Sequence, residues 1–250
     1  MELVTFKKDV WGREVILGAS WDLLWVLLAV TFVGIAIHAI IVAVQKKKAM
    51  PSAAGKRVER HAKIDRIFHW VMALSMFVLL ITGIFPKIGI EFAWLTIHWV
   101  AGILLTVITI FHIIRSVFWQ NFKDMWIGIK DLKEPFDQDI KPGKYSLAQK
   151  GLHATITILT LVIIVTGIIM FALIDTPWWE RTNALSENLL GWVFLLHGLA
   201  SLALVAITSL HIYFGLRPEK LFYTRSMIKG WISEHEKDEN HDREKWVIKN

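Results

Sequence analysis

Hydrophobic residues in this 250-residue chain gather in five long blocks that are almost free of charged side chains. A helix needs about 20 apolar residues to cross the hydrocarbon core of a bilayer, which is about 30 Å thick. Each block is long enough, so the pattern predicts an all-α membrane protein with five transmembrane helices. The predicted spans are residues 21–44, 67–85, 92–119, 152–174 and 189–216.

The loops between the blocks differ sharply in charge. Alternate loops hold 23 Lys and Arg residues on one side of the predicted membrane and 5 on the other. By the positive-inside rule, the N-terminus faces out and the C-terminus faces the cytoplasm. The formal net charge of +6 follows from these loops, so we do not expect a nucleic-acid partner.

Composition narrows the cofactor chemistry. The chain has no cysteine, which excludes disulfides, thiolate-bound iron–sulfur clusters and the covalent attachment of c-type haem. The 10 histidines are therefore the main candidate metal ligands. Trp is abundant, with 13 residues mostly near block ends, where indole rings anchor helices at the membrane–water interface.

An internal repeat is present in the last four blocks. The stretch "HWVMALSMFVLLITGIF" resembles "HATITILTLVIIVTGII", 84 residues later, and the blocks that follow them are offset by 99. The region therefore consists of two copies of a helix pair, with the first block outside the repeat. The matched residues are His69 and His153, Thr82-Gly83 and Thr166-Gly167, His98 and His197, and His112 and His211.

Two of the repeated blocks each contain two histidines, 14 residues apart. In a helix, 14 residues rise about 21 Å and turn to within about 40° of four full turns. His98 and His112 therefore share one helix face, and so do His197 and His211. Because both helices run in the same direction, His98 is level with His197, and His112 with His211.

Histidine is expensive in a membrane span and usually has a partner inside the bundle. A hydrogen bond to a neighbour explains a lone residue such as His38. Two facing imidazoles can instead hold a haem by its two axial positions, whereas zinc or copper would want further ligands. Small residues near the histidines leave room for such a ring, although they also fit tight helix packing: Gly83, Ala101, Gly102, Gly167, Ala200 and Ser201.

Several motifs carry a family resemblance, in the order "RIFHW" at 66–70, "LLITGIF", "IHWVAG", "KYSLAQKG" at 144–151, "LLHGLASLAL", "HIYFGL" and "MIKGWI". The sequence resembles the cytochrome b (gamma) subunit of membrane-bound formate dehydrogenases and the related cytochrome b of nickel–iron hydrogenases. The resemblance covers about residues 60–235. It implies a four-helix core with two b haems, so the helix at 21–44 is an extra one.

The resemblance also implies ligands. It assigns the outer haem to His98 and His197, and the inner haem to His69 and His211. It implies quinone reduction near the inner haem, where the segment with Tyr145 makes Ser146 and Gln149 candidate quinone contacts.

The inner level leaves alternatives open. Height and facing alone pair His112 with His211, whereas the resemblance pairs His69 with His211. His112 and His153 depart from the family pattern, and three roles are open for them: ligands of a third haem, proton handling for a quinone, or packing.

The sequence thus predicts an electron-transfer subunit of a quinone-linked oxidoreductase in a bacterial or archaeal cytoplasmic membrane, in contact with lipid. The resemblance implies the iron–sulfur and catalytic subunits of a dehydrogenase or hydrogenase as partners, with haem b and quinone bound. Two other classes are open alternatives, a histidine-relay proton or ion transporter and a structural membrane anchor of a complex. We expect an N-terminal segment with the extra helix at 1–50, a haem-binding core at 51–216, and a cytoplasmic tail at 217–250 that is amphipathic and then charged and solvated.

Overall fold

The computed structural model describes residues 3–20, 22–45, 53, 55–129, 131–137, 140–183 and 185–246. Trp21, with which the first predicted span begins, lies outside these ranges, and so does the predicted boundary between residues 50 and 51.

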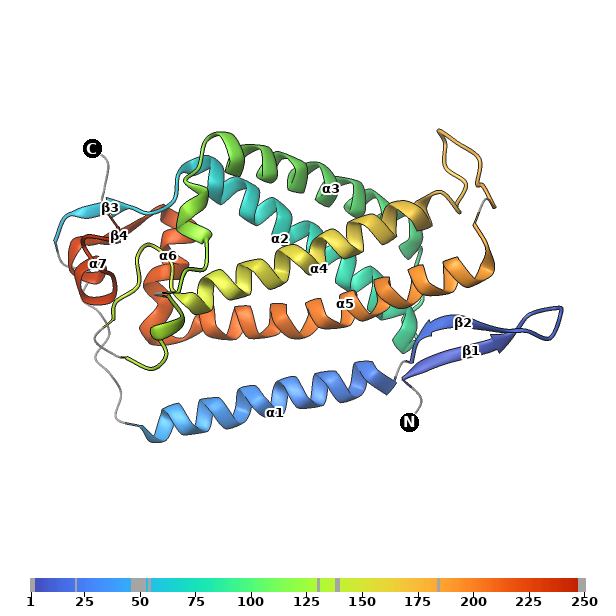
Figure 1. The fold of residues 1–250 in the computed structure, drawn as a ribbon, viewed down its shortest axis with the longest axis horizontal. Helices are drawn as coiled ribbons and strands as arrows, with labels where there is room; N and C mark the ends of the chain where they lie inside the picture. Colours follow the sequence, from blue (N-terminus) through green and yellow to red (C-terminus); the bar gives the residue numbers. More distant parts are fainter. Residues whose placement is uncertain are drawn as a thin grey trace. The chain divides into compact units, whose positions relative to one another are not determined.

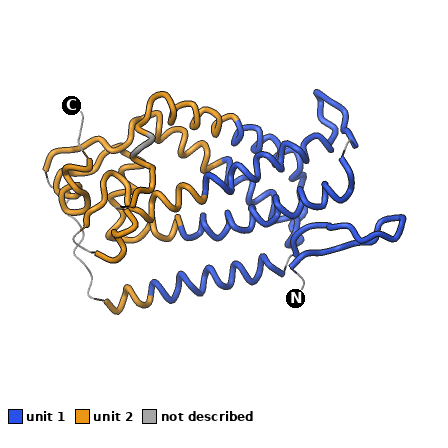
Figure 2. Tube along the Cα trace, viewed as in Figure 1, with its two compact units in different colours: residues 1–39, 75–106, 156–210 blue, residues 40–74, 107–155, 211–250 orange. Residues whose placement is uncertain are grey.

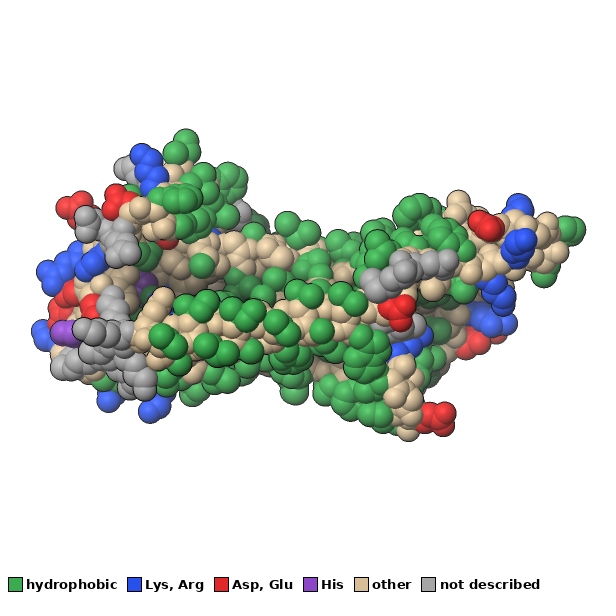
Figure 3. All heavy atoms as spheres, turned by 90° about the horizontal axis from the view of Figure 1, so that it is seen from below, with side chains coloured by type: hydrophobic (Ala, Val, Ile, Leu, Met, Phe, Trp, Pro, Cys, Tyr) green, Lys and Arg blue, Asp and Glu red, His purple; other side chains and the backbone are tan. Residues whose placement is uncertain are grey.

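Among the described residues, five helices are long and apolar enough to cross a membrane, which confirms the predicted all-α fold (Figure 1). In Figure 3, hydrophobic side chains are abundant along the middle of the visible face, whereas charged side chains gather toward its left and right ends, as expected for segments that face lipid. The helix ends differ from the predicted spans by only a few residues. The helices are α1 (Asp22–Val44), α2 (Lys63–Ile84) continued by the 3-10 turn η1 (Phe85–Ile88), α3 (Trp94–Phe118), α4 (Leu147–Phe171) and α5 (Glu187–Leu216).

The chain forms two compact units, and each of the five long helices contributes residues to both (Figure 2). Unit 1 comprises residues 1–39, 75–106 and 156–210, and unit 2 comprises residues 40–74, 107–155 and 211–250. Each predicted histidine pair lies within a single unit, His98/His197 in unit 1 and both pairings of His211 in unit 2.

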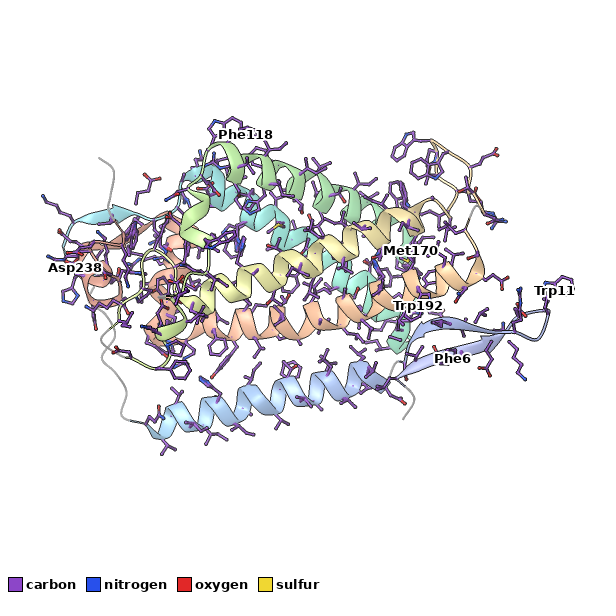
Figure 4. The ribbon with its side chains drawn as sticks, in the orientation of Figure 1. Phe6, Trp11, Phe118, Met170, Trp192 and Asp238 are labelled. Atoms are coloured by element: carbon purple, nitrogen blue, oxygen red, sulfur yellow. The ribbon has the colours of Figure 1, made fainter. Side chains whose placement is uncertain are left out.

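Unit 1 contains a β-hairpin that precedes α1. Strands β1 (Val4–Lys8) and β2 (Glu14–Ala19) pair antiparallel, with a register shift between Thr5 and Phe6. Trp11 lies in the connecting turn and Phe6 on β1 (Figure 4). The hairpin packs on α5 at Gly191, where an added Cβ would lie 2.3 Å from the Ile16 carbonyl oxygen. Only glycine allows this approach of the two backbones.

Unit 2 contains a small module beside its helix segments, which we call the C-terminal module (residues 57–59 and 218–246). It consists of β3 (Arg57–Glu59), η4 (Pro218–Lys220), α6 (Leu221–Lys229), β4 (Trp231–Ser233) and α7 (Glu234–Asn240), with β3 and β4 paired antiparallel. Its apolar core is Val58, Phe222, Ile232 and Trp246. The short 3-10 turns η2 (Phe122–Met125) and η3 (Asp131–Lys133) lie between α3 and α4.

Gly230 joins the module to the segment before α2. Its φ of 90° suits glycine, and its carbonyl oxygen accepts hydrogen bonds from the backbone N–H groups of Arg60 and His61, at 2.8 and 3.1 Å. The prediction of a solvated charged end is wrong for two of its residues, although others, such as Lys245, are exposed. His241 is 1% exposed and Trp246 is 7% exposed, because both pack into the module.

Candidate functional site: paired histidines of the long helices

His98 of α3 and His197 of α5 face each other in unit 1. Their ring centres are 6.4 Å apart, and the ring planes differ by 60°. This is the pair that helix geometry alone predicted, because the two residues occupy equivalent positions in the repeated helices.

A threonine on the neighbouring helix fixes the orientation of His98. The Thr82 hydroxyl lies 2.7 Å from the Val78 carbonyl oxygen and 2.7 Å from the His98 Nδ1. A hydroxyl has one hydrogen, and the carbonyl can only accept it. The hydroxyl therefore accepts a hydrogen bond from Nδ1–H of His98. In the resulting neutral imidazole, the lone pair lies on Nε2, which is the form that binds a metal.

The second copy of the repeat reproduces this arrangement. The Thr166 hydroxyl lies 2.6 Å from the Val162 carbonyl oxygen and 2.8 Å from the His197 Nδ1. The same tautomer follows, so both imidazoles of the pair have Nε2 free as a ligand. The sequence pointed to Thr82 and Thr166 only as markers of the repeat, and their role as histidine partners emerges from the fold.

The glycines that follow these threonines lie against the imidazoles. A Cβ added at Gly83 would lie 3.6 Å from the His98 Cε1, and one at Gly167 would lie 3.6 Å from the His197 Cε1. Each Thr-Gly dipeptide thus bonds one ring through its hydroxyl and leaves room for that ring at its glycine. Larger side chains at the glycines would displace the rings.

His69 of α2 and His211 of α5 lie together in unit 2. Their ring centres are also 6.4 Å apart, with an interplanar angle of 65°. Of the two pairings left open for His211, the structure brings His69 to it.

His112 of α3 is instead beside His153 of α4, at 6.0 Å and 71°. The phenyl ring of Phe68 stacks on His112, with ring centres 4.5 Å apart. The Nδ1 of His112 is buried and has no hydrogen-bond partner among the described residues. The six candidate histidines therefore form three pairs.

The three separations can be compared with what axial haem ligation requires. Two nitrogen–metal bonds of about 2 Å each, plus about 1 Å from each nitrogen to its ring centre, place the ring centres about 6 Å apart. The observed 6.4, 6.4 and 6.0 Å fit this requirement. A haem supplies its other four nitrogens itself, so two imidazoles complete its coordination. Among the described residues, no three His, Cys, Asp or Glu side chains come together as a metal site without a haem would require.

A cluster of basic and aromatic side chains lies in unit 2 outside the membrane-spanning helices. The His61 ring lies 6.2 Å from the Tyr145 ring, and Arg60 and Lys144 lie over that ring at 5.3 and 5.5 Å. Burial, followed by the charges of Arg60 and Lys144, lowers the pKa of His61 to about 3. Burial raises the pKa of Tyr145 to about 12. His61 and Tyr145 are therefore neutral hydrogen-bonding groups at pH 7. Sequence reasoning missed Arg60 and His61 because they lie in a basic loop.

Ser146 and Gln149, the two candidate quinone contacts, cap the start of α4. The Ser146 backbone N–H donates to Gln149 Oε1 at 3.0 Å, and the Gln149 N–H donates to Ser146 Oγ at 3.4 Å. This reciprocal pattern is a capping box, which satisfies free N–H groups at the start of α4. Helix capping explains both side chains without a ligand, and their contact with quinone stays a prediction.

Paired imidazoles between long apolar helices are typical of integral membrane proteins that bind haem through histidine. Residues 60–230 match the model of the prokaryotic cytochrome b561 family, and the chain belongs to that family. Membership implies haem b as cofactor and a role in membrane electron transfer, and it confirms the resemblance predicted from the motifs.

Several curated relatives carry more specific names. The chain is 27% identical over 210 residues to the formate dehydrogenase cytochrome b556 subunit of Haemophilus influenzae, covering 75% of this chain and 82% of that one. It is 26% identical over 196 residues to the nitrate-inducible formate dehydrogenase cytochrome b556(Fdn) subunit of Escherichia coli K12, covering 71% and 83%. For the cytochrome b556(fdo) subunit of the same strain, the values are 22% over 205 residues, 74% and 90%.

Proposed function

We propose that this chain is the membrane subunit that connects a dehydrogenase to the quinone pool through haems held by His98/His197 and His69/His211. The observation that carries the proposal is the equal ring separation of 6.4 Å in the two pairs, one in each unit. When bound, haem b supplies reversible one-electron chemistry that no side chain of this chain offers.

The chain's own residues bind and orient the group. Thr82 and Thr166 present the Nε2 atoms of His98 and His197, while Gly83 and Gly167 leave space beside the rings. Thr82 and Thr166 are 2% and 5% exposed, so water does not compete for their hydroxyls. A preset tautomer lowers the cost of ligation, because no proton has to move before the nitrogen binds.

We assign quinone reduction to the neighbourhood of His61, Lys144 and Tyr145. Reduction of a quinone to a quinol consumes two electrons and two protons, and its carbonyl oxygens need hydrogen-bond donors. The Tyr145 hydroxyl, the Lys144 ammonium and the His61 ring are donors of this kind, gathered in the same unit as His69 and His211. The charge of the loops supports an orientation in which this unit faces the cytoplasm, which would supply the protons.

The relatives' names support a formate dehydrogenase as the electron donor. In this proposal, the partner's catalytic and iron–sulfur subunits oxidise formate, and the membrane chain passes the electrons to quinone. A hydrogenase is the second candidate, since the motif resemblance covers both.

The test is spectroscopic, on the purified full-length chain and on its complex. We expect a b-type α-band in the reduced-minus-oxidised spectrum, appearing with formate in the complex. His98→Ala and His69→Ala should each remove one haem in a pyridine haemochrome assay. His38→Ala is the matched control, because His38 lies on α1 outside the three pairs. A wild-type chain that binds no haem would contradict the proposal.

A further inference from the structure

The internal repeat relates two of the histidine pairs to each other. Exchanging the two copies turns His69 into His153 and His211 into His112. The pair His69/His211 thereby becomes His153/His112, whereas His98/His197 is converted into itself. The repeat therefore generates one self-matched pair and two mutually equivalent pairs.

The two equivalent pairs also have similar ring geometry in the structure. His112 and His153 lie 6.0 Å apart at 71°, compared with 6.4 Å and 65° for His69 and His211. Both pairs lie in unit 2. A ring separation suited to axial ligation therefore occurs twice there, once on α2 and α5 and once on α3 and α4.

Two buried polar atoms on α3 also lack partners among the described residues. They are the Nδ1 of His112 and the hydroxyl of Thr109, three residues earlier and thus about one helical turn away. Buried polar atoms without partners are rare in folded proteins and call for an explanation, such as an occupant. Arg115, a turn further along α3, forms an ion pair with Asp65 at 2.6 Å. The charge of Arg115 is therefore balanced by the protein itself.

We propose that His112 and His153 hold a third b haem, the repeat-related counterpart of the haem at His69/His211. The inference rests on the proposed function, since it takes the other pairs to be haem sites. Phe68, stacked on His112 and 8% exposed, would fix the plane of that imidazole and shield the site from water. The residue precedes His69, so α2 contributes to both sites in unit 2.

The first measurement is the haem content of the full-length protein in its complex, by pyridine haemochrome and quantitative amino-acid analysis. Three haems per chain are expected, decreasing to two in His112→Ala and in His153→Ala. His38→Ala should retain three. A wild-type content of two, unchanged in His112→Ala, would overturn the third site while leaving the proposed function intact. A content of zero would contradict both.

A double variant separates independent sites from a shared one. If His69 and His112 serve different haems, His69→Ala combined with His112→Ala should retain one haem of three. If both residues serve the same haem, the double variant will retain as many as either single variant, and the third site is wrong.

A conservative variant covers the case in which the alanine proteins do not fold. His153→Met keeps an axial ligand, and His/Met ligation gives a higher reduction potential than His/His. We expect three haems, with one component of the redox titration shifted to higher potential. An unshifted titration in the folded His153→Met protein would overturn the proposal. A wild-type content of two, with slower quinone reduction in His112→Ala, would instead indicate proton handling by this pair.

Discussion

The hydroxyl oxygen of Thr82 lies 2.7 Å from the Nδ1 of His98, and the repeat places Thr166 in the same relation to His197 at 2.8 Å. Each threonine also donates to a carbonyl one turn earlier in its own helix, so it can only accept from the histidine. A membrane helix thereby uses its own backbone to set the tautomer of an imidazole on the next helix.

Thr82→Val removes this acceptor while keeping the shape of the side chain. We expect the His98/His197 haem to be retained about 10–100-fold less tightly, the usual loss when a partner of a metal ligand is removed. Its reduction potential should rise, because an imidazole whose N–H lacks an acceptor is a weaker donor to the oxidised iron. Redox titration and haem loss during dialysis against an apo-acceptor measure both effects.

Thr106→Val is the control for that substitution. Thr106 makes the same bond to a carbonyl in its helix, to Gly102 at 2.8 Å, and within the described part of the chain it has no hydrogen bond to a histidine. The control should leave the potential unchanged. Equal shifts in Thr82→Val and Thr106→Val would show that the effect arises from helix packing and not from His98.

Gly83 provides a second handle on the same site. An alanine Cβ would lie 3.6 Å from the His98 Cε1, an ordinary contact, so Gly83→Ala should keep the haem content. Gly83→Leu would extend into the ring and should abolish the His98/His197 haem. The pyridine haemochrome assay measures the number of haems per chain in each variant. An unchanged number in Gly83→Leu would mean that His98 moves freely.

Much of this site follows from the sequence, because helical periodicity fixes what a single helix presents. The 14-residue step gave matched histidines on α3 and α5, and His98 does face His197. The same argument paired His112 with His211, and the structure places His153 and His69 beside them instead. Height along a helix does not determine which neighbour lies beside it, since lateral packing is a tertiary property.

Other features had weak signals in the sequence. The three-residue strands β3 and β4 are too short for a period-two pattern to stand out. The charged end of the chain is predicted to be solvated because most of its residues are polar. His241 and Trp246 nevertheless pack into the C-terminal module and hold this end against it. Ser233 and Glu236 form a capping box at α7, and the Ser-x-x-Glu spacing of this motif is visible in the sequence.

The contact between the hairpin and α5 gives a prediction about stability. Gly191→Ala would bring its Cβ to 2.3 Å from the Ile16 carbonyl oxygen and 2.9 Å from the Ile16 Cβ, so the hairpin must move. We expect a loss of about 1–3 kcal/mol of hairpin docking and faster proteolysis near Trp11. Gly198→Ala on the same helix is the control, because its Cβ would lie 3.6 Å from the Ala19 Cβ. Similar cleavage of both variants would contradict the close approach.

The C-terminal module should be sensitive to acid through His241. Its Nδ1 donates to the Gly143 carbonyl oxygen at 2.6 Å, and its Nε2 accepts from Arg60 at 3.1 Å. Burial, followed by the charge of Arg60, lowers the pKa of His241 to about 4. The unfolded module binds a proton near pH 6.5, which the folded module does not. The stability that neutral His241 contributes is therefore fully present above about pH 6.5 and decreases as the pH falls toward 4.

By this linkage, His241 alone should cost the module about 2 kcal/mol at pH 5 relative to pH 7.5. His61, with a pKa of about 3, adds a loss of the same sign. Hydrogen exchange of residues 230–246 between pH 7.5 and 5, corrected for the intrinsic rate, measures this change.

His241→Asn should be less stable at pH 7.5, because the acceptor for Arg60 is lost, but its protection should depend less on pH. His235→Asn, on the exposed side of α7 with a side chain 57% exposed, should behave like the wild type. If wild type and His241→Asn lose protection in parallel, the acid sensitivity arises elsewhere, since only the wild type has a proton to bind at this position.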